Sequence, residues 1–407
     1  MSARARPMLI LVSDIHLTDR LKGPSVSRAE HFDRFWVRID AARGEAPAHL
    51  CFVGDLFDIV RSPLWHDSEV RPYHAPSPAQ ERLVERIAGD ILAREQPFLE
   101  RVRARVAAGE LVVHYVLGNH DRLLAHAPAA RRAIAFALRG REEPADFPAE
   151  MVFPDHGVLA FHGHTTDFIC HEPDGGPPIG DAIASDLIVR FPRALRARLG
   201  AELPELDDID DVRPIFAVPA WVRYYAVRQK GVLAPVGDVW RGLVEDFLEN
   251  GYVRDWMHAH SGGALSEGGK LKLLLQLSTG RFMRKTKDAR LGQVYRFFQH
   301  FFDGRFARRA AELLDAPAYR GLRFVVNGHS HFSSMTPLGQ VDGRPACYFN
   351  TGTWRTVHQM GRGADGAPAF LPYEAMTYLC FFPSGDRLGR DFEWWTGALV
   401  SNESLGS

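Results

Sequence analysis

Cysteine is scarce in this chain, and the few cysteines are far apart. Only four occur in 407 residues, and none forms a Cys-x-x-Cys pair. A disulfide framework or a thiolate zinc site would need cysteines at recognisable short spacings. We therefore expect reduced, buried thiols at Cys51, Cys170, Cys347 and Cys380.

Long apolar runs are lacking as well. The basic N-terminal segment, Met1 to Pro7, leads into an apolar run that extends only from Met8 to Val12. Such a run is too short for the core of a signal peptide. No run in the chain approaches the roughly 18 apolar residues of a membrane-spanning helix. We therefore expect a cytoplasmic protein without a transmembrane segment.

Neither sign of charge is in excess. The formal net charge is -1, and 46% of the residues are hydrophobic, which is enough for a sizeable core. This balance argues against a chain built for nonspecific binding to nucleic acid or to anionic membranes, although a local basic patch would not show in it. Oligomeric state is left open.

One basic run interleaved with aromatic residues lies between Arg281 and Phe297. One interpretation is a contact with a substrate phosphate or with the surface of a membrane. We favour a solvated helix face whose aromatic side packs on neighbouring helices.

Five short apolar runs have the pattern of buried strands, and each stops at a glycine or at a polar residue of a metal-binding type. Helical spacing at Leu83, Ile87 and Ile91, resuming after Pro97, separates the second run from the third. Alternation of this kind predicts a layered α/β domain. The runs are Met8–Val12, His49–Val53, Leu111–Leu117, Val158–Phe161 and Leu322–Val326.

Residues 166–319 differ from the rest of the chain. They begin with a loop rich in glycine and proline and an acidic run, and helical patterns follow. A segment of this length inside a compact domain needs structure of its own. We therefore predict a core in two parts, residues 1–165 and 320–407, interrupted by a mostly helical cap, residues 166–319, here called the insertion.

Metal-binding side chains follow the first two apolar runs. Asp14 and His16 lie two positions apart, and in extended backbone such side chains point the same way, so both can reach one ion. Asp55 follows Gly54, where the backbone can turn tightly and present the carboxylate outward.

The later runs add neutral ligands. Asn119 offers a carbonyl oxygen, His162 or His164 an imidazole, and His329 and His331 form a further pair two positions apart. Oxygen and nitrogen ligands without thiolate suit manganese, iron or zinc. We expect two divalent ions, with manganese favoured.

The carboxylates of Asp14 and Asp55 would neutralise only part of the charge of two divalent ions, and the remainder would attract a phosphate. Two ions about 3.5 to 4 Å apart can lower the pKa of a bridging water, which we expect to be the nucleophile. His120, beside Asn119, is placed to stabilise phosphoryl oxygens or to protonate the leaving group, and Asp121 is expected to orient it. His120 and Asp121 are thus the predicted catalytic pair.

Two further side chains have open roles. Asp58 fits either an outer position that orients a ligand or a turn and helix-cap role. His164 fits a direct ligand, a contact with a ligand, or a contact with substrate. We prefer His162 as the ligand, because it immediately follows the strand and precedes a glycine.

Taken in order, these motifs resemble those of the calcineurin-like metallophosphoesterases. The resemblance covers residues 8 to 165 and 320 to 355, and the insertion lies outside it. The matching residues are Asp14-Ile15-His16, Gly54-Asp55-Leu56-Phe57-Asp58, Gly118-Asn119-His120-Asp121, His162-Gly163-His164 and Gly328-His329-Ser330-His331.

The resemblance implies a four-layer αββα sandwich with the site at the carboxyl ends of the strands. It also implies hydrolysis of a phosphomonoester, phosphodiester or pyrophosphate bond in a phosphorylated small molecule or nucleotide conjugate. His120 would be the acid or the group that stabilises the transition state. One metal would be held by Asp14, His16, Asp55 and His331, and the other by Asn119, His162 and His329, with Asp55 bridging the two.

A narrower likeness concerns the segment from Tyr348 to Trp354. It resembles the closing motif of a bacterial branch that includes the UDP-2,3-diacylglucosamine pyrophosphatases. Those enzymes typically carry arginine where this chain has His120, and the long insertion is a second departure. Two alternatives stay open: a nuclease, which would need a long positive groove, and a non-catalytic metal-binding scaffold, which would typically have lost ligands.

Overall fold

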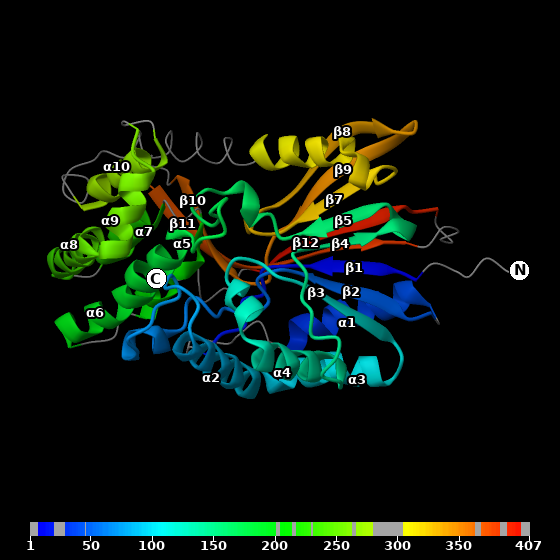
Figure 1. The fold of residues 1–407 in the computed structure, drawn as a ribbon, viewed down its shortest axis with the longest axis horizontal. Coiled ribbons are helices and arrows are strands. Elements are labelled where there is room, and N and C mark those ends of the chain that lie inside the picture. The colour runs from blue at the N-terminus through cyan, green and yellow to red at the C-terminus, as the bar shows by residue number, and fades with distance from the viewer. Residues whose placement is uncertain are drawn as a thin grey trace, which may run out of the picture.

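Two β-sheets packed face to face form the centre of the molecule in the computed structural model (Figure 1). The structure describes residues 7–19, 29–44, 46–200, 204–213, 217–228, 231–262, 266–279, 304–362, 368–382 and 389–399. The basic run between Arg281 and Phe297 lies outside these residues. The general α/β class predicted from the sequence is confirmed.

The first sheet begins with three parallel strands, whose carboxyl ends therefore meet at one edge. They are β1 (Leu9–Val12), β2 (Ala48–Val53) and β3 (Leu111–Val116). The sheet order is β3-β2-β1-β11-β10-β6, with β12 paired to β11. The closing part is antiparallel and consists of β10 (Thr356–Arg362), β11 (Pro368–Phe381) and β12 (Phe392–Leu399).

The second sheet has the order β4-β5-β7-β9-β8. Its central strands β5, β7 and β9 are parallel to one another. The strands are β4 (Glu150–Phe153), β5 (Val158–Phe161), β7 (Phe324–Asn327), β8 (Ser333–Val341) and β9 (Arg344–Thr351). The five apolar runs predicted as strands thus correspond to β1, β2, β3, β5 and β7.

Burial on both faces explains why these strands are continuous apolar runs. Along β1, Ile10 and Val12 face a cluster shared with four helices, whereas Leu9 and Leu11 face the second sheet. The four helices lie together against the first sheet (Figure 1). They are α1 (Ala29–Arg43), α2 (Pro78–Arg94), α3 (Gln96–Ala107) and α4 (Pro128–Arg139).

The outer face of the second sheet is covered by the helix at 304–315, drawn in yellow in Figure 1. Its Phe306 and Ala310 pack on Leu159 of β5 and Val325 of β7. This helix belongs to the predicted insertion, but it packs on the second sheet. The described residues therefore show helices on both outer faces of the paired sheets.

The rest of the insertion gathers at one end of the sheets around a hydrophobic cluster of its own (Figure 1). The two-residue strand β6 (Val212–Arg213) belongs to this segment and pairs in parallel with β10. The insertion is thus anchored to the first sheet. Its helices are α5 (Ile179–Ala182), the π-helix at Ile183–Val189, α6 (Arg190–Leu199), α7 (Val218–Ala226), α8 (Leu233–Glu249), α9 (Gly251–Ala259) and α10 (Glu267–Thr279).

Two expectations from composition can be compared with the structure. None of the described helices has both the length and the apolar character needed to cross a bilayer. The four cysteines are all free thiols, and three of them are buried, whereas Cys170 is half-buried.

Candidate metal centre

The loops that follow β1, β2 and β3 of the first sheet meet the loops that follow β5 and β7 of the second. Backbone hydrogen bonds join the first two loops, from the Asp14 N–H to the Gly54 carbonyl (3.2 Å) and from the His16 N–H to the Asp55 carbonyl (2.9 Å). All seven side chains predicted as ligands lie at this junction: Asp14, His16, Asp55, Asn119, His162, His329 and His331.

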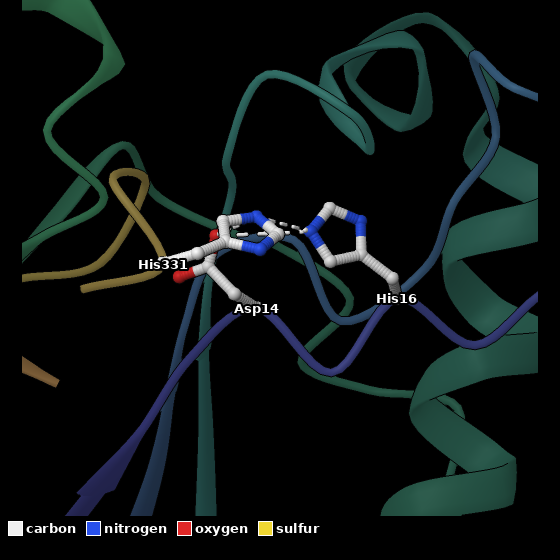
Figure 2. Close-up of side chains that lie close together, drawn as sticks. All are labelled: Asp14, His16 and His331. Carbon is white, nitrogen blue, oxygen red and sulfur yellow. Dashed lines mark hydrogen bonds and ion pairs between the residues drawn. The ribbon is translucent and has the colours of Figure 1, made fainter. Parts of the chain in front are cut away.

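Three of them form one compact group. The Nε2 atoms of His16 and His331 lie 3.1 Å apart, and His331 Nε2 lies 3.2 Å from Asp14 Oδ1. Figure 2 shows the two imidazole rings facing one another beside the Asp14 carboxylate. His331 enters from the loop after β7, and Asp14 and His16 come from the loop after β1. The group therefore contains residues from both sheets.

A second group surrounds Asp55. The Nε2 atom of His162 lies 3.1 Å from Asp55 Oδ2 and 3.1 Å from Asn119 Oδ1. The Nδ1 atom of His329 lies 3.0 Å from the same Asn119 oxygen. Asp55 also faces the first group, because its Oδ2 atom lies 3.8 Å from His16 Nε2. It lies between the two groups, and the family resemblance implies a bridging ligand at this residue.

The structure distinguishes between the two histidines that follow β5. His162 is buried and contacts Asp55 and Asn119, whereas the His164 ring centre lies 5.6 Å from that of His162. The His164 Nδ1 atom is buried without a hydrogen-bond partner. His162 is thus the member of the pair that reaches the cluster, and its role as a ligand stays a prediction.

Backbone strain is concentrated at the residues predicted as metal ligands. Among the described residues, six other than glycine have positive φ, and five of them are predicted ligands. A positive φ is uncommon outside glycine and costs about 1–3 kcal/mol, so it persists where the surrounding structure fixes it, often at functional sites. The five are Asp14, His16, Asp55, His329 and His331.

Two glycines allow the loops to approach this closely. A Cβ atom at Gly118 would collide with the Asp55 carboxylate, and one at Gly328 would collide with the Asp14 carboxylate. Neither glycine has positive φ, so the requirement is for space and not for an unusual backbone conformation. The short Gly-Asn-His and Gly-His-Ser-His motifs are therefore explained by close packing against two carboxylates.

The segment from Tyr348 to Trp354 holds the Asp14 loop in place through hydrogen bonds. Ser13 Oγ lies 2.6 Å from Thr351 Oγ1 and donates a hydrogen bond to Asp14 Oδ2 (2.5 Å). The Thr353 hydroxyl donates to the Asp14 carbonyl at 2.6 Å. This segment therefore fixes the direction of the Asp14 carboxylate.

The predicted partnership of His120 and Asp121 requires a correction. His120 Nδ1 lies 3.0 Å from Asp58 Oδ1, so Asp58 contacts the imidazole. Asp121 is buried, and both of its oxygens accept hydrogen bonds elsewhere, from Gly118 N–H (2.6 Å), Leu56 N–H (3.0 Å) and the Tyr115 hydroxyl (2.5 Å). Neighbours in sequence point apart here, because the carboxylate fills a pocket of backbone donors.

Burial and neighbouring charges shift the pKa values of the site in different directions. Burial, followed by the charge of Asp55, raises the pKa of Asp121 to about 7. Burial opposes protonation of His162, but the carboxylates of Asp55 and Asp14 outweigh it and raise its pKa to about 10. For His16 and His331, burial and then the nearest arginine lower the pKa far below the usual range. Burial therefore disfavours a positive charge on either ring.

The donor set fits a metal centre. Asp14 Oδ1 is buried without a hydrogen bond, and two imidazole nitrogens converge beside it. Several sets of three side chains lie close enough to share an ion. These include Asp14, His16 and His331, and also Asp14, Asp55 and His162. Buried His and Asp groups of this kind are consistent with a divalent metal site.

Several residues at the site were not predicted from the sequence. Asp167 Oδ2 lies 3.1 Å from His329 Nε2 and thus orients that ring. Arg61 places a guanidinium nitrogen 2.8 Å from His16 Nδ1, and its Nε lies 2.8 Å from Asp58. Arg213 comes from the insertion and lies 3.2 Å from His331 Nε2. Only Asp167 carried a usable signal, its position just after His162-Gly163-His164.

Comparison with known proteins adds no family assignment. No protein-family model matches the chain, and a search of curated proteins finds no match. The likeness to the metallophosphoesterases therefore remains one of sequence motifs.

Proposed function

We propose that this chain is a hydrolase of phosphate esters that depends on two divalent metal ions, and that it belongs with the calcineurin-like metallophosphoesterases. The observation that carries the proposal is the meeting of seven oxygen and nitrogen ligands from five strand ends in two adjoining groups. The helix, sheet, sheet, helix layering of the described residues supports the same proposal.

The two groups divide as the resemblance implies. Asp14, His16 and His331 would hold one ion, with Asp55 shared between the ions. The second ion would be held by Asn119, His162 and His329. Two carboxylates among seven ligands leave net positive charge at the centre, which favours an anionic substrate such as a phosphate ester. Manganese is the ion we expect, with iron or zinc as substitutes.

When bound, the ions supply an activated water and stabilise charge on the phosphoryl oxygens. The residues of the chain provide orientation and a proton. His120 lies beside the cluster, its ring centre 4.8 Å from that of His16, and it lines the adjoining cavity. Asp58 fixes the Nδ1 side of the imidazole, so Nε2 is the atom left to face a phosphoryl or leaving-group oxygen.

The test is a manganese-supplemented assay over aryl phosphate monoesters and diesters and nucleotide-sugar pyrophosphates, combined with metal analysis. We expect turnover with two metals bound, a loss of about 10²–10⁴-fold in His120→Ala, and near-complete loss in Asp55→Asn. His126→Ala, which changes an exposed histidine, is the control. Two bound metals without turnover on any of these substrates would indicate a binding scaffold and contradict the proposal.

A further inference from the structure

A cavity of about 270 Å³ adjoins the metal centre. One end is formed by Asn119, His120, His329 and His331. The remaining wall is mainly apolar and is supplied largely by the insertion. Its side chains include Ile183, Leu187, Ile188, Trp240, Leu271 and Leu275. The lining is thus mainly apolar, and its charged side chains include Asp167, Asp181 and Asp210 besides those of the candidate metal centre.

Arg213 also lines this cavity. It is carried by β6, the strand by which the insertion joins the first sheet. Its Nη1 atom donates to the carbonyls of Asp210 (2.7 Å) and Val212 (3.0 Å), and its Nη2 atom lies 3.2 Å from His331 Nε2. The backbone therefore holds one side of the guanidinium and directs the other side toward the metal end.

Two neighbouring arginines are neutralised, whereas Arg213 is not. Arg61 pairs with Asp58 (2.8 Å) and Asp210 (3.4 Å), and Arg355 pairs with Asp210 (3.2 Å) and Asp211 (2.6 Å). Arg213 makes no ion pair with any carboxylate of the described residues. A half-buried cation without a carboxylate is costly, and an anionic ligand would offset that cost.

We propose that this cavity binds a phosphate ester whose phosphoryl oxygens accept hydrogen bonds from Arg213 and whose organic part is a compact apolar group. The inference rests on the proposed function, because it takes the metal centre as the place of the phosphoryl group. A guanidinium fork matches the spacing of two phosphoryl oxygens. The insertion therefore supplies both an anion contact and the apolar wall.

The size and lining of the cavity restrict the organic group. Ligand pockets range from roughly 300 to 1,000 Å³, so this cavity is at the small end and suits a ring or a short alkyl chain. Any polar group of a nucleoside that faced Leu187, Leu271 or Leu275 would lose hydrogen bonds to water. The observations thus favour an apolar alcohol over a nucleotide.

Alkyl and aryl phosphonates provide the test, because they keep the anion and cannot be hydrolysed. Affinities for methyl-, butyl- and phenylphosphonate are measured by calorimetry on the full chain, with and without Mn²⁺. We expect affinity to rise about threefold to fourfold for each methylene, so butylphosphonate binds roughly 30-fold more tightly than methylphosphonate. Equal affinity across the series would overturn the apolar part of the proposal.

Variants separate the two parts of the cavity. Arg213→Gln is expected to weaken all three phosphonates by about 10- to 100-fold, and Arg213→Lys by less, since it retains the charge. Leu271→Asn is expected to weaken only butyl- and phenylphosphonate. The controls are Arg193→Gln, an exposed arginine of α6, and Leu273→Asn, which is 50% exposed on the same helix as Leu271.

Two outcomes distinguish this inference from the proposed function. Phosphonate binding that depends on Arg213 and Leu271, without turnover of any phosphate ester, would contradict the proposed hydrolase activity and still support the proposed binding cavity. Turnover of phosphate esters, together with phosphonate affinities that are unchanged in Arg213→Gln and Leu271→Asn, would contradict the proposed binding cavity and still support the proposed hydrolase activity.

Discussion

Two buried aspartates near the metal centre contact different parts of it. Asp58 lies between the His120 imidazole and Arg61, at 3.0 Å and 2.8 Å. Asp121 instead accepts two backbone N–H groups and the Tyr115 hydroxyl, and so holds the loop after β3 against the loop after β2. The first contact orients the His120 side chain, which lines the cavity, and the second shapes the backbone.

This difference predicts that two isosteric substitutions act on different quantities, one on kcat and the other on the free energy of unfolding. Asp58→Asn should lower kcat by about 10- to 100-fold, because the imidazole loses its orienting carboxylate, and it also removes the buried ion pair with Arg61. Asp121→Asn should lower the free energy of unfolding by about 1–3 kcal/mol, because an amide nitrogen would face backbone donors. Steady-state kinetics and urea unfolding on both variants measure this. A larger kinetic defect in a well-folded Asp121→Asn would favour the partnership predicted from the sequence.

A third residue-scale prediction concerns acid stability away from the site. His114 on β3 lies 3.0 Å from His49, and burial, followed by the charges of His49 and Arg139, lowers the pKa of His114 from 6.5 to about 4. Between these pH values the unfolded chain binds a proton that the folded chain excludes, so stability is lost as the pH falls. This group should cost about 1–2 kcal/mol between pH 7 and pH 5.

Urea unfolding of the wild-type chain and of His114→Gln at both pH values isolates this contribution. Acid also protonates the histidines of the metal centre, but that loss is common to both proteins. The variant should therefore lose about 1–2 kcal/mol less than the wild type between pH 7 and pH 5. Equal losses in the two proteins would show that His114 is not the responsible group.

Among the structural elements, the strand-end loops depend on glycines that leave no room for a Cβ atom. Gly118→Ala would push on the Asp55 carboxylate, which stands between both groups of ligands. We expect Mn²⁺ affinity, measured by calorimetry, to fall at least about 10-fold, with helix content unchanged by circular dichroism. Gly89→Ala on α2 is the control, because no atom lies within 4 Å of the added Cβ. Unchanged affinity in Gly118→Ala would mean that the loop relaxes freely.

The same elements show what the sequence could predict. Strands buried on both faces leave an apolar run that is easy to recognise, and the residue after such a run must lie at the edge of the sheet. The seven side chains predicted as ligands were selected in this way, and the structure brings them together. Asp121 was assigned the wrong contact, because the direction of a side chain after a turn depends on the backbone donors around it. That information comes from packing with Leu56 and Tyr115.

Residues supplied by the insertion could not be predicted. Arg213 reaches the centre only because β6 pairs with β10, about 145 residues away in the sequence, and two residues of strand leave no periodic signal. The acidic run at Asp210 and Asp211 likewise resembles a solvated segment until its pairing with Arg61 and Arg355 is seen. Polar side chains at strand ends follow from local pattern, whereas cavity-lining side chains from the insertion follow from tertiary structure.

At the scale of the whole molecule, the metal centre lies across the junction of the two sheets. Asp14, His16, Asp55 and Asn119 follow strands of the first sheet, whereas His162, His329 and His331 follow strands of the second. The sheets otherwise meet through a mainly apolar cluster that includes Leu11, Val53 and Val326. Bound ions would therefore connect the two sheets directly, in addition to this hydrophobic contact.

This arrangement predicts that metal removal destabilises the entire fold. Mn²⁺ at 100 times its dissociation constant should stabilise the folded chain by about 2.7 kcal/mol per site, and chelation should reverse the effect. Scanning calorimetry should show one transition that moves upward with Mn²⁺, and hydrogen exchange should slow in both β1 and β7. His162→Ala and His16→Ala should each remove part of the shift, whereas the exposed His126→Ala should retain all of it. If Mn²⁺ slowed hydrogen exchange only in the first sheet, the histidines that follow strands of the second sheet would not hold the ions. Ions couple the unfolding of the two sheets only when both sheets supply ligands.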